Sequence, residues 1–155
     1  MDSIDRRTFL AGTAGALTLL APGAALAQAQ PGIVMWKDPH CGCCSAWAER
    51  VQTHFREPVR IIPVADMPAL KRSRGIPEDL WSCHTGLVRG LVTEGHVPPA
   101  DIQRAIAGRS RTIRLLAVPG MPLGAPGMEA GGRSQRFQVI ALAAGGQRSV
   151  FATHG

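Results

Sequence analysis

The chain has 155 residues, which is enough for one domain with a substantial core but too few for two. Basic residues outnumber acidic ones by 17 to 11, but they are scattered as single positions and no tyrosine accompanies them. This distribution argues against a nucleic-acid-binding protein, because such proteins gather basic and aromatic side chains on one surface.

The first 27 residues are typical of an export signal. Arg6 and Arg7 precede an uncharged apolar stretch, and an Ala-x-Ala pattern ending at Ala27 supplies a cleavage site. Paired arginines at this place resemble a twin-arginine signal. The alternative is a membrane anchor, but the apolar run is broken by glycine and proline and is shorter than the ~20 residues of a spanning helix. We therefore expect cleavage, a mature domain at 28–155, and a periplasmic protein without membrane contact.

The start of the mature domain predicts a strand, a helix and a second strand. The apolar run Ile33–Lys37 is of strand length and ends at an Asp-Pro turn. Apolar side chains then recur at helical spacing over Cys43–Phe55, and residues 59–64 form a second strand. This β-α-β order, with thiols at its first turn, is typical of the start of a thioredoxin-like fold with parallel strands.

Capping and turn residues delimit the next elements. Asp66 is expected to cap a short helix that ends at Gly75. The segments around Gly90 either pair as a hairpin or form one bent strand. The expected elements are a helix at 67–74, a turn at 77–80, strands at 87–89 and 91–93, and a helix at 99–106 that ends at Gly108.

The remaining residues depart from the thioredoxin-like plan. Residues 118–129 contain too much proline and glycine for a helix or a central strand, and loops of this length are usually functional or disordered. Residues 137–142 and 149–151 predict two short strands joined by glycines. We therefore expect a single α/β, thioredoxin-like domain with a Pro/Gly/Met-rich loop and an extra C-terminal β-hairpin.

Three of the four cysteines lie within four positions, as Cys41-Gly42-Cys43-Cys44. Their expected place at a helix N-terminus stabilises thiolates. In an oxidising compartment four cysteines first suggest disulfides, with three pairings, although neighbouring Cys43 and Cys44 would pair only through a strained ring. A redox pair needs two thiols, so the third favours a metal site.

Several ions that share thiolates suit this cluster better than one ion. Adjacent cysteines point in different directions, so a single ion cannot easily bind all three sulfurs of one turn. Soft sulfur ligands select cuprous copper, zinc or iron-sulfur clusters, and thioethers favour cuprous copper further. The chain offers Met121 and Met128 on the Pro/Gly-rich loop, and Cys83 and His84 as a second group of soft ligands. A c-type haem is excluded, because Ser45 stands where its histidine is needed.

Four motifs together resemble the CopG-type periplasmic copper-resistance proteins, a family formerly of unknown function. They are, in chain order, Cys41-Gly42-Cys43-Cys44, Ser82-Cys83-His84-Thr85, Gly95-His96-Val97-Pro98, and Pro119-Gly120-Met121-Pro122 with Pro126-Gly127-Met128-Glu129. The resemblance covers residues 34–154 and implies a thioredoxin-like fold, a C-x-C-C copper site and copper handling in the periplasm.

By motif matching, the resemblance implies a set of copper ligands in this chain. The core ligands would be Cys41, Cys43 and Cys44, with Cys83, His84, Met121 and Met128 as further contributors. His40 departs from the small polar residue expected beside the cysteines, and it either adds a ligand or tunes the thiolates. Whether His96 binds metal stays open at this point.

The main hypothesis is a periplasmic copper-resistance protein that holds several cuprous ions, under a loop that excludes water. Its partners would be copper ions and a periplasmic copper donor or acceptor protein. The main alternative is a thiol-disulfide oxidoreductase that uses Cys41 and Cys44. A copper oxidoreductase combines the two ideas, and a structural zinc module is a further alternative.

Overall fold

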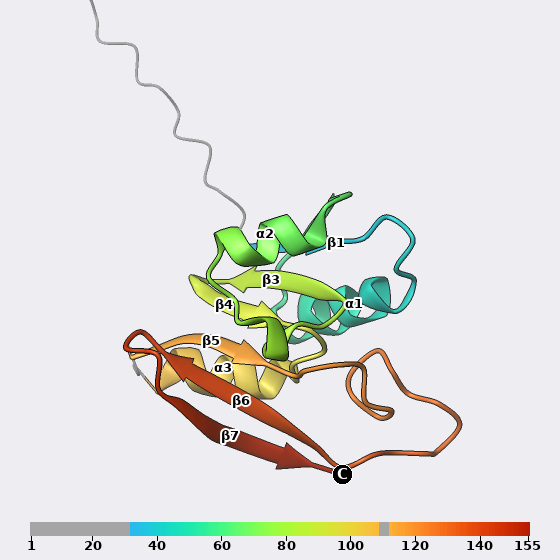
Figure 1. The fold of residues 1–155 in the computed structure, drawn as a ribbon. Helices are drawn as coiled ribbons and strands as arrows, with labels where there is room; N and C mark the ends of the chain where they lie inside the picture. The colour runs from blue at the N-terminus through green and yellow to red at the C-terminus, as the bar shows by residue number, and fades with distance from the viewer. Residues whose placement is uncertain (1–31, 109–111) are drawn as a thin grey trace, which may run out of the picture.

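The computed structural model describes residues 32–108 and 112–155, so the expected export signal at 1–27 lies outside the described residues. The described residues form a mixed α/β fold with one seven-stranded sheet and three helices (Figure 1). The strands are β1 (Ile33–Lys37), β2 (Arg60–Pro63), β3 (His84–Val88), β4 (Leu91–Glu94), β5 (Ile113–Ala117), β6 (Phe137–Ala143) and β7 (Arg148–His154). The helices are α1 (Cys43–Phe55), α2 (Met67–Ser73) and α3 (Pro99–Ala107), and η1 (Glu78–Leu80) is a 3₁₀ turn.

The strand order of the sheet is β2-β1-β3-β4-β5-β6-β7. Strands β1 and β2 are parallel, as their connection through α1 requires, and β3 runs antiparallel to β1. Strands β3 and β4 pair as a hairpin around Arg89 and Gly90, which both have positive φ. The hairpin is therefore the correct one of the two arrangements that the sequence left open.

Strand β5 is the one element within the described residues that the sequence did not predict. It pairs parallel to β4 and antiparallel to β6, and so joins the C-terminal hairpin to the rest of the sheet. Leu115 and Leu116 point to opposite faces, and both are fully buried. A strand that is buried on both faces shows no polar alternation, which removes the usual sequence signal.

The sheet has a core on each face. On one face, α1 and α3 cover a large cluster that includes Trp47, Val51 and Ile102. On the other face, a smaller cluster forms beneath Ile76 and Leu80, which follow α2. Figure 1 shows α2 on the side opposite α1 and α3.

Helix boundaries follow the capping residues. The side chain of Asp66 accepts a hydrogen bond from the amide of Ala69 and caps α2, as predicted. Helix α3 starts at Pro99 and is capped at Gly108, also as predicted. Within the described residues, no helix is both long and apolar enough to cross a bilayer.

Candidate metal centre

Three segments that are distant in sequence meet at one end of the sheet. Strand β1 ends at Lys37 and leads into residues 38–44, which carry Cys41, Cys43 and Cys44 and are called the cysteine turn below. Lys37 pairs with His84 at the start of β3. The β3–β4 register pairs Thr85 with Glu94, so Cys83 and His96 lie opposite each other just beyond the strands. The topology alone therefore gathers the C-x-C-C turn, the Cys83-His84 pair and His96.

The cysteine turn forms the N-terminus of α1. Gly42 is the N-cap residue and makes no side-chain cap hydrogen bond, and Cys43 and Cys44 are the first two helical residues. Cys41 and Cys44 form a disulfide, whereas Cys43 is a free thiol whose Sγ lies 3.5 Å from Cys41 Sγ. Cys44 is fully buried and Cys41 is partly exposed, so Cys41 is the member of the pair that solvent can reach.

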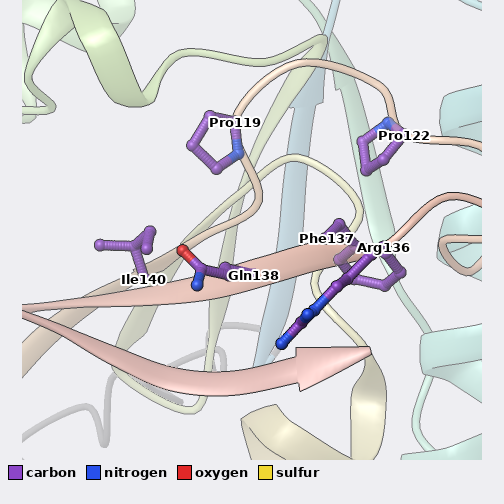
Figure 2. Close-up of a pocket in the computed structure, with 6 residues that line it drawn as sticks. All are labelled: Pro119, Pro122, Arg136, Phe137, Gln138 and Ile140. Carbon is purple, nitrogen blue, oxygen red and sulfur yellow. The ribbon is translucent and has the colours of Figure 1, made fainter. Parts of the chain in front are cut away.

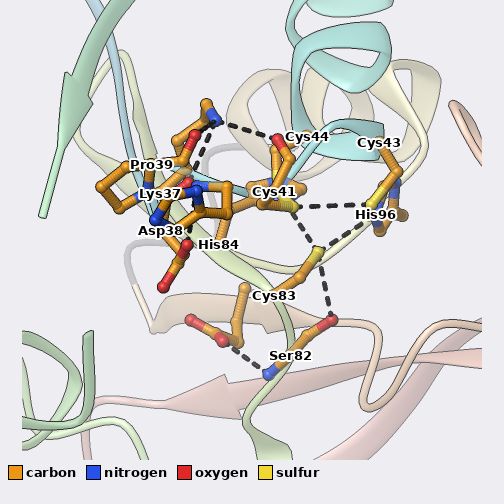
Figure 3. The surroundings of a disulfide bond; sticks show 12 residues. Lys37, Asp38, Pro39, Cys41, Cys43, Cys44, Ser82, Cys83, His84 and His96 are labelled. Carbon is orange, nitrogen blue, oxygen red and sulfur yellow. Dashed lines mark hydrogen bonds between the residues drawn. A yellow bond between two sulfur atoms is a disulfide. The ribbon is translucent and has the colours of Figure 1, made fainter. Parts of the chain in front are cut away.

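All four cysteine sulfurs form one group. The Sγ atoms of Cys41, Cys43, Cys44 and Cys83 lie within 4.8 Å of one another, and Cys83 is a free thiol like Cys43 (Figure 3). The sequence placed Cys83 in a second motif 39 positions after Cys44, and the fold brings it to the first. With the disulfide reduced, this group would present four sulfur ligands to a soft metal.

Cys83 also belongs to a second group of potential ligands, with His84 and His96. The Sγ of Cys83 lies 3.2 Å from His84 Nδ1 and 3.1 Å from His96 Nε2 (Figure 3). His96 Nδ1 donates to the carbonyl oxygen of Pro126 over 2.8 Å, which leaves the Nε2 lone pair directed at the sulfur. A hydrogen bond of this kind on the second ring nitrogen is usual for histidines that bind metal.

His96 is the candidate ligand that the sequence analysis did not assign. Its motif was noted, but nothing near it in sequence is a soft ligand. Counting outward from the Arg89-Gly90 turn places His96 opposite Cys83, so the hairpin register is the signal that could have found it. His40, in contrast, is exposed, donates its backbone amide to Asp38, and belongs to neither group.

Burial keeps these groups neutral when no metal is bound. Burial and the nearby Cys43 raise the pKa of Cys83 to about 12, so its thiol holds its proton at neutral pH. Burial lowers the pKa of His84 and that of His96, so both imidazoles are neutral and keep a lone pair. Neutral imidazoles are the form that binds metal.

The donor set fits a soft metal ion. His84 is fully buried, and its Nε2 atom has no hydrogen-bond partner, although such groups are normally satisfied. Its ring lies between Trp47, with centroids 4.4 Å apart, and His96, with centroids 5.0 Å apart. Sulfur and neutral imidazole donors together suit cuprous copper or zinc and do not suit magnesium or calcium.

A buried ion pair holds the Cys83 segment in place. Lys71 donates to Glu94 and to the carbonyl oxygen of Ser82, the latter over 2.8 Å. Glu94 in turn accepts from the Ser82 amide and from the Thr85 hydroxyl, each over 2.7 Å. Burial raises the pKa of Glu94, and Lys71 opposes that shift. The residues on both sides of Cys83 and His84 are thus fixed to one carboxylate.

The loop between β5 and β6 carries Met121 and Met128, each directly after a glycine with positive φ. Gly120 accepts a hydrogen bond from the Ser82 hydroxyl, next to Cys83. Gly127 packs on the first turns of α1, where an added Cβ would lie 2.7 Å from the Trp47 backbone nitrogen. Each methionine is therefore held one residue from a contact with a segment that carries candidate ligands. Met121 is 55% exposed and Met128 is partly buried.

The loop is tied to the body of the protein at its far end as well. Glu129 forms an ion pair with Arg50 of α1 at 2.8 Å, and the Pro126 carbonyl oxygen accepts from His96. Pro119 and Pro122, on either side of Met121, line a pocket of about 470 Å³ over β6 (Figure 2). Among the residues that the structure describes, no cysteine, histidine or methionine lines that pocket, so it is separate from the candidate metal centre.

Replacing Gly127 with alanine should detach the loop from α1. The new Cβ would meet the Trp47 backbone, and the positive φ costs an alanine a further ~1–2 kcal/mol. We expect faster amide hydrogen exchange at Met128, whose amide donates to the Ala125 carbonyl oxygen. Gly120→Ala is the matched control, because Gly120 also has positive φ but open space around its Cβ position. Equal effects of the two substitutions would contradict the contact.

The structure thus defines a small α/β protein with a cysteine and histidine cluster suited to a soft metal. Two solved structures of a copper resistance protein, CopG forms 2 and 1, resemble it closely. Form 2 is 41% identical with a TM-score of 0.74, over 79% of this chain and 97% of that one. Form 1 is 41% identical with a TM-score of 0.73, over 81% of this chain and 98% of that one.

The chain belongs to the CopG copper-resistance family, because the identity extends over nearly the whole of those structures. The family described as "Protein of unknown function, DUF411" matches residues 80–128, which include Cys83, His84, His96, Met121 and Met128. Among curated proteins, none matches this chain. The resemblance that the sequence motifs indicated is therefore confirmed.

Proposed function

We propose that this protein binds several cuprous ions on a shared set of thiolates and acts in copper resistance. The observation that carries the proposal is the position of Cys83, which belongs both to the four-sulfur group and to the Cys83–His84–His96 group. Because the Cys83 sulfur belongs to both groups of ligands, it can bridge two ions. A single ion could not bind every ligand of the two groups. The two similar solved structures are of a copper resistance protein, which favours copper over zinc.

The ligands would be the residues that the sequence selected, together with His96. They are Cys41, Cys43, Cys44, Cys83, His84, His96, Met121 and Met128. Binding to all four cysteines requires that the Cys41–Cys44 disulfide be reduced first, because a thiolate is the ligand form. The two methionines would close the cluster from the loop, since thioethers add selectivity for cuprous copper.

The proposal includes a thioredoxin-like core and an exported protein. The β2-β1-β3-β4 arrangement, with α1 and α3 on one face and α2 on the other, supports the thioredoxin-like core. Strands β5, β6 and β7 would then be an addition to it. The paired arginines at 6–7 and the cleavage pattern at Ala27 support export to the periplasm, where a copper donor or acceptor protein would be the partner.

Anaerobic titration of the reduced protein with cuprous copper tests the proposal. We expect more than one ion per chain, and we expect Cys43→Ser to lose at least one, because Cys43 is the thiol that a C-x-x-C pair does not need. Thiolate-to-copper absorption gives the stoichiometry. His54→Gln is the control, since His54 is exposed and lies outside both groups. No copper bound, or the same copper bound by Cys43→Ser, would contradict the proposal.

A second candidate function is thiol-disulfide exchange, and the Cys41–Cys44 disulfide at the N-terminus of α1 favours it. Cys41 would be the attacking thiol because it is partly exposed, and buried Cys44 would resolve the mixed disulfide. This function predicts reductase activity that survives Cys43→Ser and Met128→Leu. The copper proposal predicts that the same substitutions reduce copper binding, so the two assays on the same variants separate the functions.

A further inference from the structure

Lys37 is a buried cation next to the cysteine turn to which no function has yet been assigned. It is the last residue of β1 and is 8% exposed. Its ammonium group donates to the carbonyl oxygens of Asp38, Pro39 and Cys41, at 3.0, 3.3 and 2.9 Å. All three of its protons are thereby used, and all three acceptors belong to the turn that leads into Cys43.

Within residues 32–108 and 112–155, no carboxylate lies within ion-pair distance of the Lys37 ammonium. Lysine is rarely buried without an anionic partner, because removing its charge from water is costly. The other buried lysine, Lys71, has Glu94 as its partner. The charge of Lys37 is therefore balanced only by carbonyl dipoles, and a negative charge near the turn would stabilise it further.

The four-sulfur group offers that negative charge when it binds copper. Four thiolates carry four negative charges, so the four-sulfur group stays anionic with fewer than four cuprous ions. The N-terminus of α1 adds to the positive potential there, because it has no acidic residue in its first turn and no side-chain cap. The Lys37 ammonium group and the N-terminus of α1 thus both lie at the turn that carries Cys41, Cys43 and Cys44.

We propose that Lys37 is the positioning residue of the cysteine turn and supplies the fixed positive charge that stabilises its copper–thiolate form. By holding the carbonyl groups of Asp38, Pro39 and Cys41, it fixes the turn from which Cys41 and Cys43 meet Cys83. Its charge then favours the forms of these sulfurs that carry net negative charge, which are the thiolates of the reduced turn and the complex that four thiolates form with fewer than four cuprous ions. The copper part of this inference rests on the proposed function.

Two substitutions separate the charge of Lys37 from its hydrogen bonds. Lys37→Gln keeps a hydrogen-bond donor and removes the positive charge. Lys37→Arg keeps the donors and the positive charge, on a planar guanidinium group in place of the ammonium group. The first measurement is the cuprous affinity of each reduced variant, in competition with a chromophoric cuprous chelator. We expect Lys37→Gln to bind copper about tenfold more weakly than the unaltered chain, and Lys37→Arg to recover most of that loss.

The second measurement needs no copper. The Cys41–Cys44 disulfide is equilibrated with glutathione, so that its S–S bond breaks and two glutathione thiols form one S–S bond. The two protons of the glutathione thiols pass to the sulfurs of Cys41 and Cys44, or to the buffer from a protein sulfur that stays a thiolate. We expect Lys37→Gln to shift this equilibrium about tenfold towards the protein disulfide, or about 30 mV, with recovery in Lys37→Arg. A purely structural role for Lys37 would lower the unfolding midpoint without this charge-dependent recovery.

The outcomes are decisive in each arm. If Lys37→Gln changes neither the glutathione equilibrium nor the cuprous affinity by more than about twofold, the inference is overturned. If Lys37→Gln shows both losses but Lys37→Arg does not recover them, the positive charge is not their cause, and the role of the charge is overturned. If the unaltered chain binds no copper, the proposed function fails, but the glutathione measurement still decides the role of Lys37.

Discussion

Replacing Cys83 with serine should remove at least half of the bound copper. Cys83 is the one residue that the two ligand groups share, and it is the only sulfur in the group with His84 and His96. Its loss would leave the three sulfurs of the cysteine turn as one group and would separate them from His84 and His96. We expect the residual copper to resemble a single site, as measured by copper analysis and thiolate absorption of the anaerobically loaded protein.

The Cys83→Ser result depends on an intact fold, which the substitution should preserve. Serine is close to cysteine in size, and the position is only partly buried. Far-ultraviolet circular dichroism and urea unfolding of the metal-free protein should therefore change little. Copper binding by Cys83→Ser that equals that of the unaltered chain would show that the sulfur is not shared and would refute the bridging role.

Replacing Lys71 with methionine should lower the free energy of unfolding by about 3–5 kcal/mol. The substitution leaves Glu94 as an uncompensated carboxylate, and both side chains are almost completely buried, at 4% and 0% exposure. It also frees the Ser82 carbonyl oxygen from its hydrogen bond to Lys71. Urea unfolding of the metal-free protein, monitored by tryptophan fluorescence, measures the change.

Two control variants test whether burial of the pair is the cause. Arg72→Met removes the neighbouring charge on the same helix, where the ion pair with Glu78 is exposed, and it should cost less than about 1 kcal/mol. The double variant Lys71→Met/Glu94→Leu should recover part of the loss, because it removes both buried charges together. A Lys71→Met protein as stable as the Arg72→Met protein would contradict this account.

Local signals in the sequence were sufficient for most of the fold. The helix Cys43–Phe55 was predicted with its observed bounds, because apolar spacing and a following proline both mark it. The cap at Asp66 and the stop at Gly108 were predicted for the same kind of reason. Strand β5 was missed because its burial on both faces removes the alternation by which strands are recognised.

The candidate site depended on contacts that no local pattern contains. Crowded thiols identified the cysteine turn, soft donors elsewhere in the chain suggested Cys83, His84 and the two methionines, and the resemblance then implied that these four residues contribute ligands. His96 could not be assigned without the β3–β4 register, because its partner Cys83 is 13 residues away. The pairing of Cys41 with Cys44 was one of several that the sequence left open, and their placement on either side of the N-cap residue of α1 brings the two sulfurs together.

X-ray absorption at the copper edge of the reduced, cuprous-loaded protein tests the central claim most directly. The account predicts sulfur neighbours together with a short copper–copper distance, because ions bridged by Cys83 must lie close to one another. It also predicts that Cys83→Ser weakens or removes the copper–copper signal. Sulfur neighbours without any copper–copper signal in the fully loaded protein would show isolated ions and would contradict the shared-thiolate cluster.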